Sequence, residues 1–130
     1  YPKRRGITRV PELLDAGLKV CFGQDSIRDP WYPMGNGNLL RTLDVGLHAC
    51  HMLGMERIET ALEIVTDNGA AALNLAEYGI AVGNPARCMV LNGTTPYEVL
   101  LNQSPVLASV RDGRCLVQRA APVHEVAGWS

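Results

Sequence analysis

An acidic side chain, Asp25, follows a short apolar run and precedes a loop rich in proline and aromatic residues, Asp29-Pro30-Trp31-Tyr32-Pro33. A carboxylate in this position can bind a divalent metal ion or accept a proton from an attacking water molecule. The indole of Trp31 can form a flat apolar wall for a planar ring. Both residues also have a structural interpretation, because Asp25 can cap a turn and Trp31 can anchor the loop by packing.

The histidines do not form a metal-binding pattern. His48 and His51 are three residues apart in a segment of helical periodicity, so they could share a metal ion. No third ligand is apparent, because Glu56 lies beyond the expected helix end and His124 lies in a weakly patterned tail. Catalytic metal sites normally use about three protein ligands. We therefore interpret His48 and His51 as ordinary helical residues, and Asp25 alone cannot hold a catalytic metal ion.

The composition predicts a globular domain with a sizeable core. The chain has 130 residues, 47% of them hydrophobic, a formal net charge of −1 and a pI near 6.3. This charge gives no reason to expect nucleic acid or a membrane as a partner, and we interpret the basic cluster Lys3-Arg4-Arg5 as solvated. No membrane-length apolar run or signal peptide is recognisable, so we expect a cytoplasmic protein. The start at Tyr1 is typical of a fragment or a processed chain.

The cysteines are widely spaced and form no Cys-x-x-Cys pair. Each lies within an apolar segment, where a thiol behaves as a small buried hydrophobic group. We expect reduced, buried cysteines, and two disulfides are the alternative. The four residues are Cys21, Cys50, Cys88 and Cys115.

Hydrophobic periodicity predicts the elements that position Asp25. A strand is expected over 18–22, directly after a helix that Thr8 caps and Gly17 ends. This order is typical of half of a βαβ repeat, and the loop over 25–37 follows it. The predicted helices cover 8–16, 38–53, which Gly54 closes, and 57–75, which is interrupted at 66–69.

The second half of the chain predicts a small β structure. An apolar run over 87–91 follows a loop and is expected to be a strand. Thr95-Pro96-Tyr97-Glu98 is a capping box with proline at the first helical position, so a short helix is expected over 96–103. Asp112-Gly113 separates two further apolar runs, over 106–110 and 114–117, and predicts a two-residue hairpin turn.

Several of these segments together resemble a known family. The N-terminal Tyr1–Val10, the loop that follows Asp25 and the downstream Gly46-Leu47-His48 are similar to the C-terminal part of cytosine deaminase-like enzymes in the metal-dependent amidohydrolase superfamily. The resemblance implies an α/β fold, namely the C-terminal portion of a (β/α)8 barrel followed by strands of a small β-sandwich module. It implies that 1–77 hold the last barrel helices, the eighth strand and the active-site loop 24–37, and that 78–130 form the β module.

The resemblance also implies roles for individual residues. Asp25 corresponds to the aspartate at the end of the eighth strand, which is both a metal ligand and a catalytic residue. Ser26 and Trp31 are placed in contact with the substrate, and Ser26 stands where the family commonly has a second acidic residue. Gln24 stands where cytosine deaminase usually has histidine. One divalent metal ion, Zn or Fe, is implied, with most of its ligands outside this segment, because the sequence lacks the His-x-His pair of the family.

The function implied is that of a segment of a hydrolytic deaminase acting on cytosine or a related cyclic amidine, with release of ammonia. The implied partners are a small heterocyclic substrate, the remainder of the enzyme chain and further copies in a homo-oligomer. We expect the 130 residues alone to be inactive. The alternative is a non-catalytic module that binds a partner chain through its exposed barrel face. An upstream reading frame with His-x-His would favour the enzyme.

Overall fold

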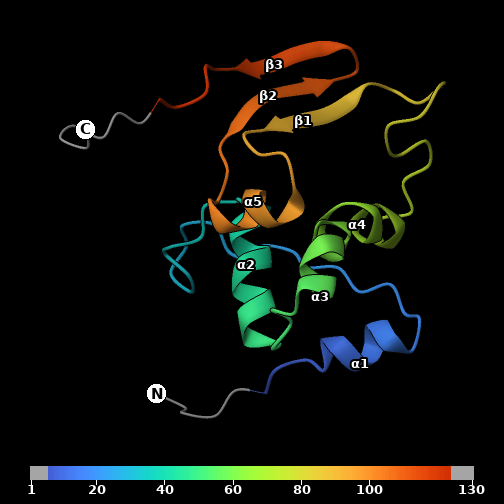
Figure 1. Cartoon of the computed structure of the whole chain (residues 1–130), viewed down its shortest axis with the longest axis vertical. Helices are drawn as coiled ribbons and strands as arrows, with labels where there is room; N and C mark the ends of the chain where they lie inside the picture. The colour runs from blue at the N-terminus through green and yellow to red at the C-terminus, as the bar shows by residue number, and fades with distance from the viewer. Residues whose placement is uncertain (1–5, 124–130) are drawn as a thin grey trace.

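The computed structural model describes residues 6–123, so Lys3-Arg4-Arg5 and His124 lie outside it. Helices form one part of the molecule and a three-stranded sheet lies at the other end, with α5 between the sheet and α2 (Figure 1). The helices are α1 (Val10–Asp15), α2 (Leu39–Ala49), α3 (Met55–Thr60), the 3₁₀ helix η1 (Ala61–Val65), α4 (Asp67–Ala72) and α5 (Pro96–Leu101). The strands are β1 (Arg87–Leu91), β2 (Val106–Arg111) and β3 (Arg114–Gln118). No helix among residues 6–123 has both the length and the apolar character that a membrane span requires.

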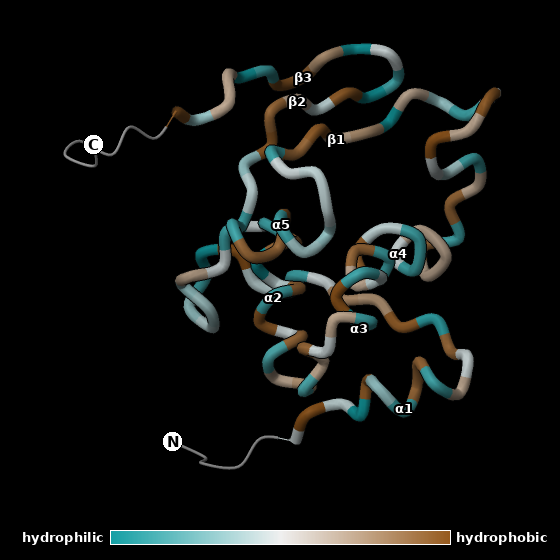
Figure 2. The backbone as a smooth tube through the Cα atoms, in the orientation of Figure 1, coloured by the Kyte–Doolittle hydropathy of each residue, from teal (hydrophilic) through white to brown (hydrophobic). Residues whose placement is uncertain are grey.

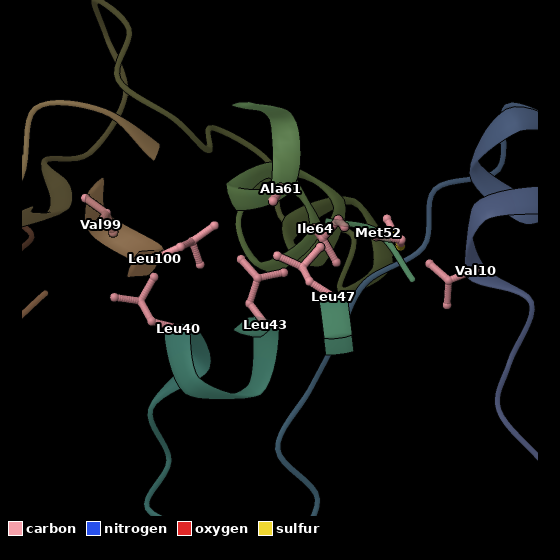
Figure 3. Close-up of a cluster of buried hydrophobic side chains, with 9 residues drawn as sticks. All are labelled: Val10, Leu40, Leu43, Leu47, Met52, Ala61, Ile64, Val99 and Leu100. Carbon is pink, nitrogen blue, oxygen red and sulfur yellow. The ribbon is translucent and has the colours of Figure 1, made fainter. Parts of the chain in front are cut away.

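The core forms where α2 packs against α5 and η1. Leu40, Leu43 and Leu47 recur at helical spacing on α2, and Leu43 is fully buried. Figure 3 shows the α2 side chains directed toward those of α5 and η1. The buried cluster consists of Val10, Leu40, Leu43, Leu47, Met52, Ala61, Ile64, Val99 and Leu100.

The sheet confirms the predicted strands and hairpin. All neighbouring strands are antiparallel, in the order β1-β2-β3. Asp112 and Gly113 both have positive φ, 50° and 77°, which matches a type I′ turn between the paired residues Arg111 and Arg114. Hydrophobic residues run along the strands (Figure 2), yet every residue of β3 is exposed.

The capping box at α5 is confirmed with one difference. The Glu98 amide donates to the Thr95 hydroxyl over 3.1 Å, as predicted. The Glu98 carboxylate, however, accepts hydrogen bonds from the amide and hydroxyl of Thr94, one residue before the N-cap. The hydrogen bond from the Thr94 hydroxyl is the main reason that the pKa of Glu98 is lowered.

The strand predicted over 18–22 is not formed, so this prediction is wrong for the chain as described. A strand requires a neighbouring strand, and none of the strands formed within residues 6–123 pairs with this segment. Helical residues bind its backbone instead. The Phe22 amide donates to the Ile64 carbonyl over 3.4 Å, and the Asn68 side-chain amide donates to the Val20 carbonyl over 2.9 Å.

Several predicted helix ends also differ. Thr8 does not cap α1, whose N-cap is Arg9. At the end of α2 it is His51, with a φ of 56°, that takes the left-handed conformation, while the Met52 amide closes the helix on the Leu47 carbonyl over 2.8 Å. Gly54 is instead the N-cap of α3.

The helix predicted over 57–75 is divided into α3, η1 and α4. The interruption falls at Thr66, with φ and ψ of −117° and −90°, which lies inside the predicted interruption. The hydroxyl of Thr66 donates to the Leu62 carbonyl over 2.8 Å, so the backbone turns without leaving this carbonyl unpaired.

The cysteines are free, but none is fully buried. Cys50 and Cys88 are half-buried, whereas Cys21 and Cys115 are exposed. The prediction of buried thiols is therefore wrong for these two residues. Cys115 lies on β3, all of whose residues are exposed, and Cys21 lies on the exposed side of the segment that pairs with no strand within residues 6–123.

Gly46 allows α2 to pack closely on Phe22. A Cβ added at Gly46 would lie 2.3 Å from Cε2 and 2.7 Å from Cδ2 of the Phe22 ring. We expect Gly46→Ala to lower the free energy of unfolding by about 1–3 kcal/mol, measured by urea denaturation, because overpacking outweighs the higher helix propensity of alanine.

Gly69 provides the matched control. It is also helical, in α4, but an added Cβ would meet nothing within 4 Å. Gly69→Ala is expected to raise the free energy of unfolding by up to about 1 kcal/mol. A rise in the free energy of unfolding in both variants would show that the Phe22 ring moves aside without cost.

Candidate active-site loop

The segment that leads to Asp25 alternates in exposure like an extended strand with one covered side. Val20 and Phe22 pack against the helical core. The half-buried positions are 20, 22, 24 and 26, and the exposed positions are 21, 23 and 25. The exposure pattern therefore places Asp25 on the side of the segment that faces away from α2 and η1.

The Asp29 carboxylate orders the loop that follows. One of its oxygens, Oδ1, accepts hydrogen bonds from the amides of Trp31 (3.0 Å) and Tyr32 (2.9 Å). The bond from Tyr32 is the largest cause of the lowered pKa of Asp29, and a hydrogen bond from the Ser26 hydroxyl contributes. Because the pKa falls on folding, this carboxylate stabilises the loop at neutral pH, and its contribution is lost as the pH falls through the lowered value.

This role of Asp29 was not predicted. The signal was present, because an aspartate before Pro-Trp-Tyr is typical of a turn in which the side chain accepts hydrogen bonds from amides that follow it.

Trp31 projects from the loop and is 91% exposed. It therefore does not anchor the loop by packing on other residues within 6–123, which was the structural alternative. Tyr32, its neighbour, is 41% exposed and lines a cavity of about 160 Å³. The other residues that line this cavity are Gln24, Met34, Arg41, Thr42 and Val45.

A glycine closes the loop on itself. A Cβ at Gly35 would lie 1.9 Å from the Ser26 carbonyl oxygen, so no other residue fits without moving the backbone. The Arg28 amide donates to the Gly35 carbonyl over 3.1 Å. The backbone at Ser26 is thus packed directly against the returning end of the loop.

The loop is also joined to α2 through Gln24. Its side-chain amide donates to the Ser26 carbonyl over 3.0 Å and accepts a hydrogen bond from the Thr42 hydroxyl over 3.1 Å. The first turn of α2 is itself fixed, because the Asn38 side chain accepts a hydrogen bond from the Leu40 amide over 3.0 Å.

The prediction that both His48 and His51 lie in a helix is confirmed only for His48. It lies in α2, where its Nδ1 is 2.9 Å from the Asp44 carbonyl oxygen and 3.4 Å from Asp44 Oδ1. His51 lies beyond the helix end, so the two residues do not share one helical face. Within residues 6–123 no group of three or more histidine, cysteine, aspartate or glutamate side chains could hold a metal ion.

The chain belongs to the amidohydrolase family. The profile of the Amidohydrolase family matches residues 1–117, which include the Asp25 loop and most of the sheet. The resemblance found in the sequence is therefore confirmed.

Among solved structures, the chain is similar to 5-methylcytosine deaminase from Klebsiella pneumoniae, with 52% identity over 97% of this chain. The TM-scores are 0.90 for its complex with phosphonocytosine and 0.91 for its complex with 5-fluorocytosine. N-isopropylammelide isopropylaminohydrolase from Burkholderia multivorans, at 24% identity and a TM-score of 0.83, shares the fold.

Two curated relatives are each 30% identical to the chain. They are N-isopropylammelide isopropyl amidohydrolase from Pseudomonas sp. strain ADP, over 84% of this chain, and pterin deaminase from Rhizobium rhizogenes strain K84, over 93%. The chain spans 27% of the length of each relative and 31% of the Klebsiella enzyme.

Proposed function

We propose that this chain is the C-terminal portion of a metal-dependent hydrolytic deaminase that acts on cytosine or a related cyclic amidine and releases ammonia. The observation that carries the proposal is a carboxylate, Asp25, on the open side of an extended segment. This segment belongs to a chain that is 52% identical to a 5-methylcytosine deaminase crystallised with cytosine analogues.

The proposed architecture follows from the same segment. We assign 18–22 to the eighth strand of a (β/α)8 barrel, whose neighbouring strands come from the rest of the enzyme. We assign 1–77, with the loop 24–37, to the barrel and 78–130 to a β-sandwich module. Two features support this division: within residues 6–123 the segment 18–22 pairs with no strand, and β3 pairs with β2 alone, so both have a free side that such a fold would cover.

One divalent metal ion, Zn or Fe, fits this arrangement only if most ligands lie elsewhere. The Asp25 carboxylate is exposed and supplies one oxygen ligand, while the residues described contain no complete set. Such an ion, when bound, lowers the pKa of water toward neutrality.

The side chains of the loop have separate tasks in the proposed reaction. Asp25 accepts a proton from the attacking water and donates it to the departing amine. Trp31 covers one face of the planar substrate, and the Ser26 hydroxyl contacts its ring edge. The substrate is a small heterocycle, and we place the enzyme in the cytoplasm as a homo-oligomer.

Ammonia release tests the proposal. The whole enzyme, meaning the full reading frame that contains this chain, is expected to release ammonia from cytosine, 5-methylcytosine or isocytosine. The 130 residues alone are expected to release none with either Zn²⁺ or Fe²⁺, because Asp25 is a single ligand. Metal-dependent activity of the isolated chain would contradict the proposed division of the site. A whole protein that is inactive on every amino-pyrimidine would favour a non-catalytic module instead.

A further inference from the structure

We propose that Gln24 is a positioning residue, which acts with Thr42 to fix the backbone on either side of Asp25 against α2. This inference rests on the proposed function, since Asp25 is the proton carrier there. The Asp25 carboxylate makes no hydrogen bond to other residues within 6–123 that would fix it directly. Its position is thus determined by the two residues that flank it.

The first argument is the pair of hydrogen bonds that one amide makes. Gln24 Nε2 donates to the Ser26 carbonyl over 3.0 Å, so the side chain spans the peptide units on both sides of Asp25. Gln24 Oε1 accepts from the Thr42 hydroxyl over 3.1 Å. The alternative acceptor of that hydroxyl, the Asn38 carbonyl, is farther away, at 3.4 Å. An amide is suited to this task because it donates and accepts at once.

The second argument is independent of Gln24. The Ser26 carbonyl oxygen is closely approached by Gly35, where an added Cβ would lie only 1.9 Å from it. The same oxygen is therefore packed by the end of the loop and held by the Gln24 amide. Small shifts of a reacting group can cost about 100-fold in rate, so a fixed peptide unit at this point is of direct value to Asp25.

The test removes the hydrogen bonds of the Gln24 side chain by substitution, and it uses the whole enzyme. Thr42→Val keeps the shape of the side chain but cannot donate, and we expect kcat to fall about tenfold with KM little changed. Gln24→Leu removes both bonds, and we expect a fall of about 10- to 100-fold. Thr42→Ser keeps a hydroxyl at this position, so its kcat should remain within about twofold of that of the unchanged enzyme.

Thr60→Val is the matched control. Among residues 6–123 the Thr60 hydroxyl bonds only the helix carbonyls of Glu56 and Arg57, so its loss should leave kcat unchanged. A fall in kcat for Thr60→Val equal to that for Thr42→Val would overturn the proposal, because any helical threonine would then give the same result. Unchanged kcat in both Thr42→Val and Gln24→Leu would overturn it as well.

Hydrogen exchange gives a readout that does not depend on activity. In Thr42→Val, exchange of the Arg28 and Gly35 amides is expected to accelerate about tenfold, while that of Val99 in α5 stays constant. Unchanged exchange in the loop would overturn the proposal. If the unchanged enzyme releases no ammonia, the proposed function fails, and the exchange rates still decide whether Gln24 and Thr42 hold the loop.

Discussion

Replacing Asp25 by alanine in the whole enzyme is expected to reduce kcat by at least about 100-fold, the usual contribution of general acid–base catalysis. In the metal-free enzyme the thermal midpoint is expected to stay the same, because Asp25 is exposed and makes no hydrogen bond to other residues within 6–123 that folding would lose. Steady-state kinetics with the best pyrimidine substrate, together with a thermal melt, measure both quantities. The combination distinguishes a catalytic carboxylate from a turn cap, whose loss would lower the midpoint.

Two further variants make the Asp25 result specific. Asp25→Asn keeps the shape and removes the proton-accepting charge, so it should be nearly as inactive as the alanine variant. Glu59→Ala removes an exposed carboxylate from α3, far in sequence from the loop, and should leave kcat unchanged. Retention of most activity by Asp25→Asn would remove this residue from the proton-transfer mechanism.

Ser26→Asp is expected to shift substrate preference toward cytosine. A carboxylate at the ring edge would accept a charge-assisted hydrogen bond worth roughly 1.5–3 kcal/mol, which moves relative kcat/KM by about one to two orders of magnitude. The comparison needs kcat/KM for cytosine and for the best alternative substrate in both proteins.

Ser26→Asn is the control for this change. It has the size of aspartate without the charge, and it should not reproduce the shift. The comparison matters because Ser26 contributes to the lowered pKa of Asp29, so a negative charge added at position 26 would also repel the Asp29 carboxylate. An unchanged ratio in Ser26→Asp would mean that residue 26 does not face the substrate.

The features predicted best from the sequence depend on residues close together in the chain. Asp112-Gly113 determines its own hairpin, since both residues tolerate positive φ. Thr95 and Glu98 likewise place the start of α5 through a hydrogen bond across three residues. The predicted end of α2 was wrong because His51 adopts the left-handed conformation, for which histidine is a much weaker signal than the glycine at position 54.

The features missed depend on distant parts of the chain. Whether 18–22 forms a strand is decided by neighbouring strands, which its own residues do not specify. The bond between Gln24 and Thr42 joins residues 18 positions apart, and no periodicity indicates it. The roles of Asp25, Ser26 and Trp31 remain predictions, since they came from family resemblance and concern a substrate outside this chain.

Because covered and open positions alternate before Asp25, the number of residues between Val20 and Asp25 determines which side of the segment the carboxylate occupies. Val20 is held by Asn68, so its place relative to the helices is fixed. Inserting or deleting one residue between Val20 and Asp25 would move the carboxylate to the side that faces α2, although every residue type is retained. A substitution tests what one side chain does. A one-residue change in length would instead exchange the two sides, so that the side chains now on the open side would face the helices.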